Sequence, residues 1–285
     1  RCDEMRFISV ISMRIHTARS GPDYTSEVKP ILDGRCVVCH ACYDAPCQLQ
    51  LGSYQGITRG SSKQAVYDAT RMTPAAPTRL FVDADTNLEW RNKGFFPILN
   101  ERDPSPEANR EASVLARMLE LKIAEPSPDI GALPENRFDF RLDRDTHCPR
   151  IETFESFKSE HPEWGMPYGF PGLSRQEHAT LMHWIETGAQ GPSPSTLSSR
   201  DLAAIDKWET FLNGQDLKSQ LMARYIFEHW FLGDFQFPST AKGHYYELVR
   251  SKTPPHQPID LIRSRRPTDD PGVDRVYYRF RLEAA

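Results

Sequence analysis

The chain has 285 residues, of which 26% are charged, and its formal net charge at pH 7 is −4. This length allows one large or two ordinary domains, and the scattered lysines and arginines give no basic block that would favour nucleic-acid binding. No apolar run approaches the roughly 20 residues that a membrane-spanning helix needs, so we expect a soluble or peripheral protein.

Residues 1–23 are predicted to be a leader or irregular segment. The chain begins with Arg1 rather than an initiator, and the apolar run 7–11 is too short for the core of a signal peptide. We therefore expect a leader to be missing from this sequence. Residues 24–32 are predicted to form a short helix, with Thr25 or Ser26 as its cap and Glu27 in its first turn.

The most specific motif follows this helix and reads Cys36-Val37-Val38-Cys39-His40. Cys-x-x-Cys-His is the spacing that attaches haem covalently in c-type cytochromes. The thiols of Cys36 and Cys39 would bind the two vinyl groups, and His40 would be the proximal iron ligand. The motif therefore predicts haem c as the cofactor.

Two other interpretations of the motif stay open, namely half of a structural zinc site and a redox dithiol. A zinc ribbon needs a second ligand pair at a suitable distance, and the remaining cysteines, Cys2, Cys42, Cys47 and Cys148, are otherwise spaced. A thioredoxin-like motif needs a strand before it, whereas the preceding residues favour a helix.

Residues 50–150 are predicted to be a long insertion, because proline-rich stretches lie at 73–78, 103–107 and 125–134. Within it, residues 106–122 are predicted to form one amphipathic helix. Ser105 is its cap and Pro106 fits its first turn. Its apolar face consists of Ala112, Leu115, Met118 and Leu119.

A second helix is predicted from Ser174 to 185, ending at Gly188, because Ser174 and Glu177 form a capping box. With the preceding Met166-Pro167, this section resembles the end of many cytochromes c, where a methionine is the sixth iron ligand and the last helix packs across the first. Met166 is therefore the candidate distal ligand. The alternatives are an open site, a core role for Met166, or one of four histidines: His147, His161, His178 and His183.

The other cysteines are not expected to bind iron. Cys42, Cys47 and Cys148 would lie in an oxidising compartment, where Cys47 can pair with Cys148 or with Cys42. Free buried cysteines are the competing interpretation.

Residues 196–285 are predicted to begin a second, mixed helical and strand region. A helix is expected from about 200 to 213, with Leu202, Ile205, Trp208 and Leu212 as its buried face. A second helix near 217–231 is rich in aromatic residues, which fit either an ordinary core or a lipid-facing surface. Strands are predicted at 245–249 and 276–282, the last with Phe280 on its buried face and Arg279 on the other.

The residues around the motif, from Cys36 through Cys42-Tyr43-Asp44-Ala45-Pro46-Cys47 to Leu49, resemble the fatty acid cis/trans isomerase family. The segments 77–85 and 90–100 extend the resemblance, which covers most of the chain from about Tyr24 onward. It implies a periplasmic c-type haem protein that converts cis double bonds of membrane phospholipid acyl chains to trans, with peripheral membrane contact and without ATP or NAD(P)H. Members of the family are longer proteins, so we expect the C-terminal part to be truncated.

The expected fold is mainly α: a cytochrome c-like haem domain over residues 24–191 with the insertion at about 50–150, then the mixed region. The expected mechanism is a transient weakening of the double bond near the haem, with no proton-transfer residue. One alternative function is an electron-transfer cytochrome domain of a larger periplasmic oxidoreductase. A zinc-stabilised interaction module is another.

Overall fold

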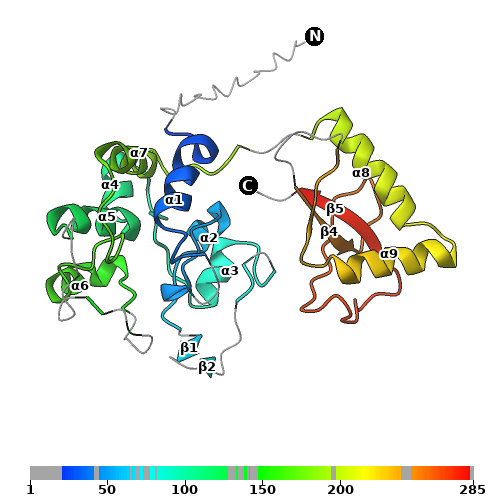
Figure 1. Cartoon of the computed structure of the whole chain (residues 1–285), viewed down its shortest axis with the longest axis horizontal. Coiled ribbons are helices and arrows are strands. Elements are labelled where there is room, and N and C mark those ends of the chain that lie inside the picture. Colours follow the sequence, from blue (N-terminus) through cyan, green and yellow to red (C-terminus); the bar gives the residue numbers. More distant parts are fainter. Residues whose placement is uncertain are drawn as a thin grey trace, which may run out of the picture. The chain divides into compact units, whose positions relative to one another are not determined.

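The structure, a computed structural model, describes residues 21–41, 45–64, 66–68, 71–72, 78–80, 82–127, 133, 138–139, 141, 147–193, 197–238 and 245–282. The chain divides into two compact units, Arg1–Val38 with Pro97–Gln190 and Cys39–Phe96 with Gly191–Ala285. Figure 1 labels the helices and strands of the chain. Most of the expected leader, residues 1–20, lies outside the described residues. The predicted domain limits at 24, 191 and 196 stay predictions. No helix in these described ranges is long and apolar enough to cross a membrane.

The first unit begins with a π-helical turn, Tyr24–Val28, that continues into α1, Lys29–Arg35. The helical segment therefore ends three residues later than predicted, and its cap is Asp23, which accepts a hydrogen bond from the Ser26 N–H, rather than Thr25 or Ser26. Tyr24, Val28 and Leu32 are buried on one face, as their spacing of four residues requires.

The predicted helix 106–122 is two helices, α4 (Pro106–Glu111) and α5 (Val114–Ala124). The break occurs at Ser113, whose backbone is extended. The Ser113 hydroxyl accepts the Ala116 N–H and lies 3.0 Å from the carbonyl oxygen of Ile98, to which it donates. A buried contact distant in sequence therefore ends one helix and caps the next. Ser105 caps α4 as predicted.

The unit closes with a 3-10 turn (Ile151–Thr153), α6 (Phe154–Glu160) and α7 (Arg175–Glu186). The capping box of Ser174 and Glu177 is present as predicted. The N-terminal helical segment contacts α7, as expected, because the rings of Tyr24 and Trp184 lie 6.0 Å apart and Arg35 Nε donates to Glu177 Oε1 at 2.8 Å.

The second unit has two stretches of chain. The first contains a 3-10 turn (Pro46–Gln48), α2 (Tyr54–Arg59), β1 (Tyr67–Asp68), β2 (Arg71–Met72) and α3 (Asn87–Asn92). The second contains α8 (Ser199–Leu212), α9 (Leu217–His229), β3 (Asp234–Phe235), β4 (Tyr246–Ser251) and β5 (Tyr277–Leu282). Strands β3, β4 and β5 form an antiparallel sheet in that order, with Leu248 opposite Phe280. The stretch from Ser199 to Leu282 thus contains both helices and strands.

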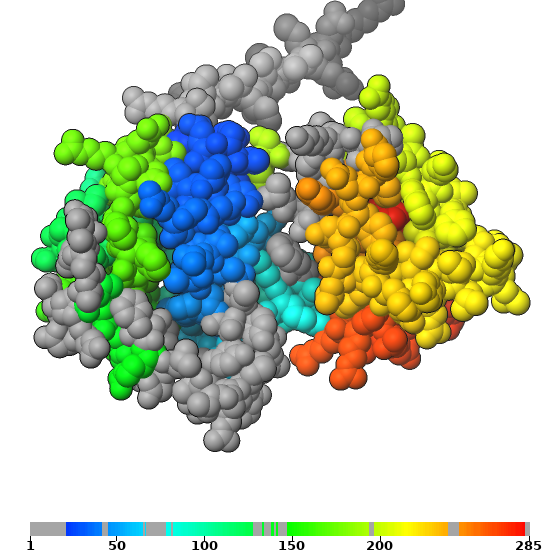
Figure 2. Space-filling view, viewed as in Figure 1, coloured from blue at the N-terminus to red at the C-terminus, as the bar shows by residue number. Residues whose placement is uncertain are grey.

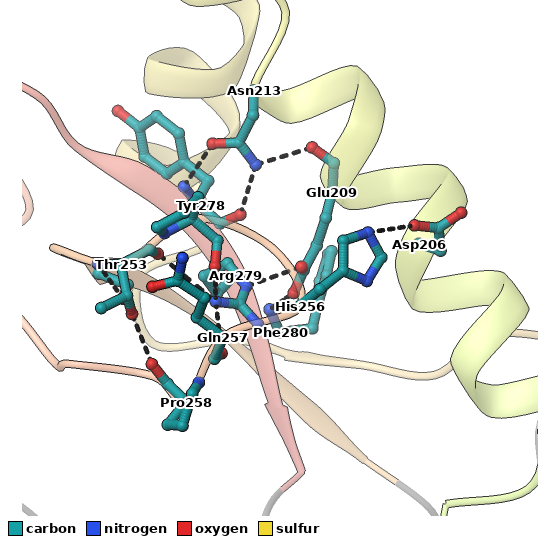
Figure 3. A network of polar contacts seen from close by, with 12 residues as sticks. Asp206, Glu209, Asn213, Thr253, His256, Gln257, Pro258, Tyr278, Arg279 and Phe280 are labelled. Atoms are coloured by element: carbon teal, nitrogen blue, oxygen red, sulfur yellow. Dashed lines mark hydrogen bonds and ion pairs between the residues drawn. The ribbon is translucent and has the colours of Figure 1, made fainter.

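The buried face of α8 differs from the prediction. Leu202 and Trp208 are exposed, whereas Glu209, Asp201 and Leu212 are buried. Glu209 can be buried because Arg279 Nε donates to its Oε2 at 2.7 Å and the Phe280 N–H donates to its Oε1 at 2.8 Å (Figure 3). Carboxylates satisfied in this way replace apolar residues on the inner face of the helix.

The ion pair between Glu209 and Arg279 also explains why β5 departs from the predicted alternation of buried and exposed residues. Phe280 enters the core as predicted, but Arg279 on the opposite face is also buried. Its Nη1 donates to the carbonyls of Pro254 at 2.7 Å and Gln257 at 3.1 Å (Figure 3), so the guanidinium is bound on several sides. Asn213 adds two hydrogen bonds to the backbone of Tyr278. Helix α8 is thus tied to β5 by polar groups.

We predict that Glu209→Ala lowers the free energy of unfolding by about 3–5 kcal/mol, because it leaves the buried guanidinium of Arg279 without its counter-charge. Urea unfolding followed by circular dichroism measures this loss. The matched control is Glu247→Ala on β4, which removes the half-exposed partner of Arg281 on β5. It should lower the free energy of unfolding by at most about 1 kcal/mol. Equal losses in the two variants would contradict a special role for the buried pair.

A second prediction concerns the ion pair between Arg35 and Glu177. The hydrogen bond that Glu177 accepts from Arg35 lowers the pKa of its carboxyl group from 4.5 to about 2, and hydrogen bonds from Ser174 add to this shift. The carboxylate therefore stabilises the fold above about pH 4.5, and this contribution is lost as the pH falls toward 2. The difference in unfolding free energy between the unaltered chain and Glu177→Gln should shrink over that window, by a modest amount because the pair is partly exposed. When Arg35 is already replaced by Gln, the Glu177→Gln change should lose most of its pH-dependent effect on the unfolding free energy. An undiminished pH dependence in that background would show that Arg35 does not stabilise the Glu177 carboxylate.

Candidate functional site

The Cys36–His40 motif lies directly after α1. Cys36 caps the helix, and the N–H groups of Cys36 and Val37 both donate to the Leu32 carbonyl, at 2.8 Å and 3.0 Å. Cys36 is half-buried and Cys39 is exposed, and both are thiols rather than disulfides. The chain runs through consecutive turns from Cys36 to Cys39, so the helix end fixes the first thiol and the following turns present the second to solvent.

His40 is the buried member of the motif, with 8% of its surface exposed. Its Nδ1 lies 3.1 Å from the Leu49 carbonyl oxygen, and its own carbonyl accepts the Leu51 N–H at 2.8 Å. A carbonyl only accepts hydrogen bonds, so Nδ1 carries the ring proton and Nε2 keeps its lone pair. Burial lowers the pKa of His40, partly opposed by the bond to Leu49. The imidazole is therefore neutral near pH 7, which is the state that binds iron.

The loop that offers the Leu49 carbonyl has an unusual backbone. Cys47 and Gln48 both have positive φ, 59° and 49°, a region that non-glycine residues seldom adopt. The side-chain amide of Gln48 donates to the Gln64 carbonyl and accepts from the Thr78 hydroxyl, each at 2.8 Å. The Ser62 N–H donates to the Cys47 carbonyl at 2.8 Å. The loop is thus held on several sides in one conformation.

Arg59 provides the remaining constraint on this loop. The residue lies at the C-terminal end of α2 and is 1% exposed, and its Nη2 donates to the Gln48 carbonyl at 2.5 Å. The guanidinium carbon lies 4.8 Å from the ring centre of Phe95 and 5.5 Å from that of Trp90. Among the described residues, no carboxylate forms an ion pair with it. Desolvation lowers the pKa of Arg59 to about 10, so it remains a cation at neutral pH.

Sequence analysis did not single out Arg59. The signals for its burial, Trp90 and Phe95, come more than thirty residues later in the chain, and an arginine near the end of a short helix is ordinary. The Arg59 cation contacts two aromatic rings and the Gln48 carbonyl. It thereby holds the loop whose Leu49 carbonyl orients His40.

Met166, the predicted distal ligand, is half-buried in the loop before α7. Its N–H donates to the Met118 carbonyl at 3.1 Å. The loop approaches α5 so closely that a Cβ atom on Gly165 would lie 2.3 Å from the backbone nitrogen of Lys122. Met166 belongs to the first unit and His40 to the second.

The alternative histidines lie in different settings. His161 stacks on Trp164, with ring centres 4.2 Å apart, and lies beside His147 at 4.4 Å. The Nε2 atoms of His161 and His178 are buried without a hydrogen bond, and burial lowers the pKa of both rings. His147 and His183 are exposed. Among these four, His161 and His178 therefore have a buried nitrogen available for a ligand.

Cys47 and Cys148 both take part in disulfides. Cys42, the other cysteine considered for pairing, lies outside the described residues, so the pairing stays a prediction. In the part of the chain that the structure describes, no group of three or more His, Cys, Asp or Glu side chains is placed to hold a metal ion.

Comparison with known proteins identifies one family. The family model described as fatty acid cis/trans isomerase (CTI) matches residues 75–285. The match includes the segments 77–85 and 90–100 that carried part of the resemblance, and it begins after the Cys36–His40 motif. No curated protein and no solved structure gave a match.

We predict that Arg59→Ala lowers the free energy of unfolding by about 3 kcal/mol, because it leaves the Gln48 carbonyl unpaired and a cavity between Trp90 and Phe95. Arg102→Ala is the control, since the Arg102 side chain forms an exposed ion pair with Glu152, and its loss should change stability little. Denaturant unfolding measures both variants. A loss for Arg59→Ala no larger than that for Arg102→Ala would show that the guanidinium does not hold the loop.

Proposed function

The chain belongs to the fatty acid cis/trans isomerase family, and on that premise we propose that it isomerises the cis double bonds of phospholipid acyl chains with the help of a covalently attached c-type haem. Family membership gives the enzyme class, an isomerase, and the substrate class, fatty acids. The haem, the membrane phospholipid substrate, peripheral membrane contact and a periplasmic location are the proposed refinements.

The hydrogen bond between His40 Nδ1 and the Leu49 carbonyl carries the haem proposal. A proximal histidine needs a neutral ring, a fixed orientation and a free Nε2, and no hydrogen bond occupies the Nε2 of His40 within the described residues. Cys36 and Cys39 add two reduced thiols at the spacing for thioether bonds. The three residues therefore fit the group.

A bound haem would supply an iron porphyrin able to withdraw electron density from a nearby alkene, which lowers the π order that opposes rotation. The residues of the chain would have simpler tasks. Cys36 and Cys39 would anchor the group, His40 would bind its iron, and Leu49 and Arg59 would keep the imidazole in place. Substrate and product have the same atoms and the same oxidation state, so no side chain needs to transfer a proton and no ATP or NAD(P)H is required.

We retain Met166 as the proposed sixth ligand. A thioether raises the reduction potential relative to a second imidazole, which favours withdrawal of electron density. His161 and His178 are the alternatives supported by their available Nε2 atoms. Replacement of each residue, followed by the absorption spectrum of the ferric and ferrous protein, distinguishes these ligands.

Two observations support the other refinements. The disulfides at Cys47 and Cys148 fit an oxidising compartment such as the periplasm. A helix before the motif that contacts α7 near the end of the unit fits a cytochrome c-like domain. An electron-transfer cytochrome would share the haem residues, but membership of an isomerase family favours the first function.

The test uses the full chain, exported to a periplasm that has c-type maturation enzymes. The purified, denatured protein should give the α band of a c-type pyridine haemochrome, and cells that produce it should contain a larger fraction of trans acyl chains. The Cys36→Ala/Cys39→Ala variant should lose both the band and this increase. Val38→Ala is the control, because Val38 is an exposed residue inside the motif. A colourless protein that still raises the trans fraction would refute the haem. A haem protein without isomerase activity would favour the electron carrier.

A further inference from the structure

Arg59 is a buried cation that uses few of its hydrogen-bond donors. A guanidinium carries five N–H donors and stays charged at neutral pH. In the part of the chain that the structure describes, the Arg59 side chain donates one hydrogen bond, from Nη2 to the Gln48 carbonyl, and its Nε is buried without an acceptor. Parts of the stretch 45–64, light blue in Figure 2, reach the surface, whereas Arg59 within it is 1% exposed. The bond to Gln48 thus leaves the charge without a counter-ion.

The carboxylates of α3 and of the segment before it have other partners, although α3 contacts α2. Asp83 pairs with Arg79, Asp85 with Arg263, and Glu89 with the Thr86 N–H. The two aromatic rings beside Arg59 offset part of the free energy that burial of its charge costs. A buried charge is normally paired as well, so we expect the anion to come from a bound group.

Gln55 adds a second unsatisfied polar group on the same side of α2. Residues four apart lie above one another on a helix, as Gln55 and Arg59 do. The Oε1 atom of Gln55 is buried without a hydrogen bond. A half-turn of the amide exchanges its oxygen and nitrogen, which brings two N–H donors to that point. A guanidinium and an amide on one side of a helix suit a carboxylate, because both of its oxygens accept hydrogen bonds.

The position of Arg59 near His40 indicates which carboxylate fits. Arg59 binds the Gln48 carbonyl, and the carbonyl of the next residue, Leu49, accepts the hydrogen bond from His40. These residues all belong to the second unit. The acyl chains of a phospholipid are esters and offer no carboxylate, whereas a haem held by His40 carries two propionates. The propionate is therefore the carboxylate that the proposed function supplies.

We propose that Arg59 forms an ion pair with a haem propionate, with Gln55 as a further donor. The inference rests on the proposed function, because the haem is part of that proposal. It explains why a cation, rather than a neutral donor, holds the Gln48 carbonyl. Arg59 would cancel the negative charge of the propionate, which otherwise stabilises ferric iron, and so would keep the reduction potential high.

The experiment measures the reduction potential of the haem-loaded full chain from about pH 5 to 8. Arg59→Met should shift the potential downward, because the propionate charge is no longer cancelled. The potential of this variant should then rise as the pH falls, since a buried carboxylate without its cation has a raised pKa and gains a proton in this range. Arg59→Lys keeps the charge, so its shift should be smaller and its potential should gain no pH dependence.

Arg91→Met is the matched control. Arg91 also stabilises the end of α2, because its guanidinium donates to the carbonyls of Arg59 and Thr58 at 2.7 Å and 3.0 Å. Its replacement should leave the potential and its pH profile unchanged. An equal shift in Arg91→Met would overturn the proposal, because loosening of α2 would then explain the effect. The proposal also fails if Arg59→Met has the potential and pH profile of the unaltered chain.

Resonance Raman spectroscopy decides the question if Arg59→Met does not bind haem. The propionate bending band of the unaltered chain should lie at the frequency of a hydrogen-bonded carboxylate and should move in Arg59→Lys. A band at the frequency of a free propionate in the unaltered chain would contradict the ion pair.

Further outcomes separate this inference from the proposed function and from another carboxylate. A haem protein without isomerase activity whose potential falls in Arg59→Met would support the ion pair and refute the isomerisation. An active haem enzyme whose potential is unchanged in Arg59→Met would refute the ion pair alone, and a colourless chain would overturn both. Oleate added to the unaltered chain should not change the potential. A saturable change that Arg59→Met abolishes would overturn the proposal and assign the guanidinium to a free fatty acid.

Discussion

The buried guanidinium of Arg59 is the constraint on which the candidate site depends. Desolvation of a cation costs free energy, which here is offset by two aromatic rings and the Gln48 carbonyl. In return, it holds a loop with two left-handed, non-glycine residues, each of which costs about 1–2 kcal/mol and persists only where neighbours over-determine it. The loop then presents the Leu49 carbonyl to His40. The orientation of the imidazole is therefore built into the fold.

A buried ion pair has a comparable effect in the sheet region. Glu209 and Arg279 attach α8 to β5 through charges and backbone carbonyls, so the inner face of α8 needs fewer apolar side chains. Leu202 and Trp208 are correspondingly exposed. Helix α9 packs differently, through Ala223 and Phe227. Buried charges thus hold α8 against the sheet and buried apolar residues hold α9, while other apolar side chains of both helices stay exposed.

Local features could be predicted from the sequence, whereas contacts between distant residues could not. The capping box of Ser174 and Glu177, the cap at Ser105 and the strand β4 depend on neighbouring residues, and all were predicted. The break at Ser113 depends on the Ile98 carbonyl, and the burial of Glu209 depends on an arginine 70 positions away. Arg59 was missed for the same reason. Hydrophobic periodicity assumes that charged residues face water, and these buried, paired charges violate that assumption.

The proposed reaction makes two demands on the protein, a fixed position for His40 and access to the substrate. Rotation about a double bond consumes no atoms, electrons or protons, so the protein needs no acid–base pair at its centre. If a haem supplies the electron-withdrawing group, the protein would need residues that hold this group in a fixed position. It also needs access to acyl chains that are packed in a bilayer. The loop at His40, which Arg59 holds and whose Leu49 carbonyl bonds to the imidazole, would meet the first need, whereas the second concerns surfaces away from that loop.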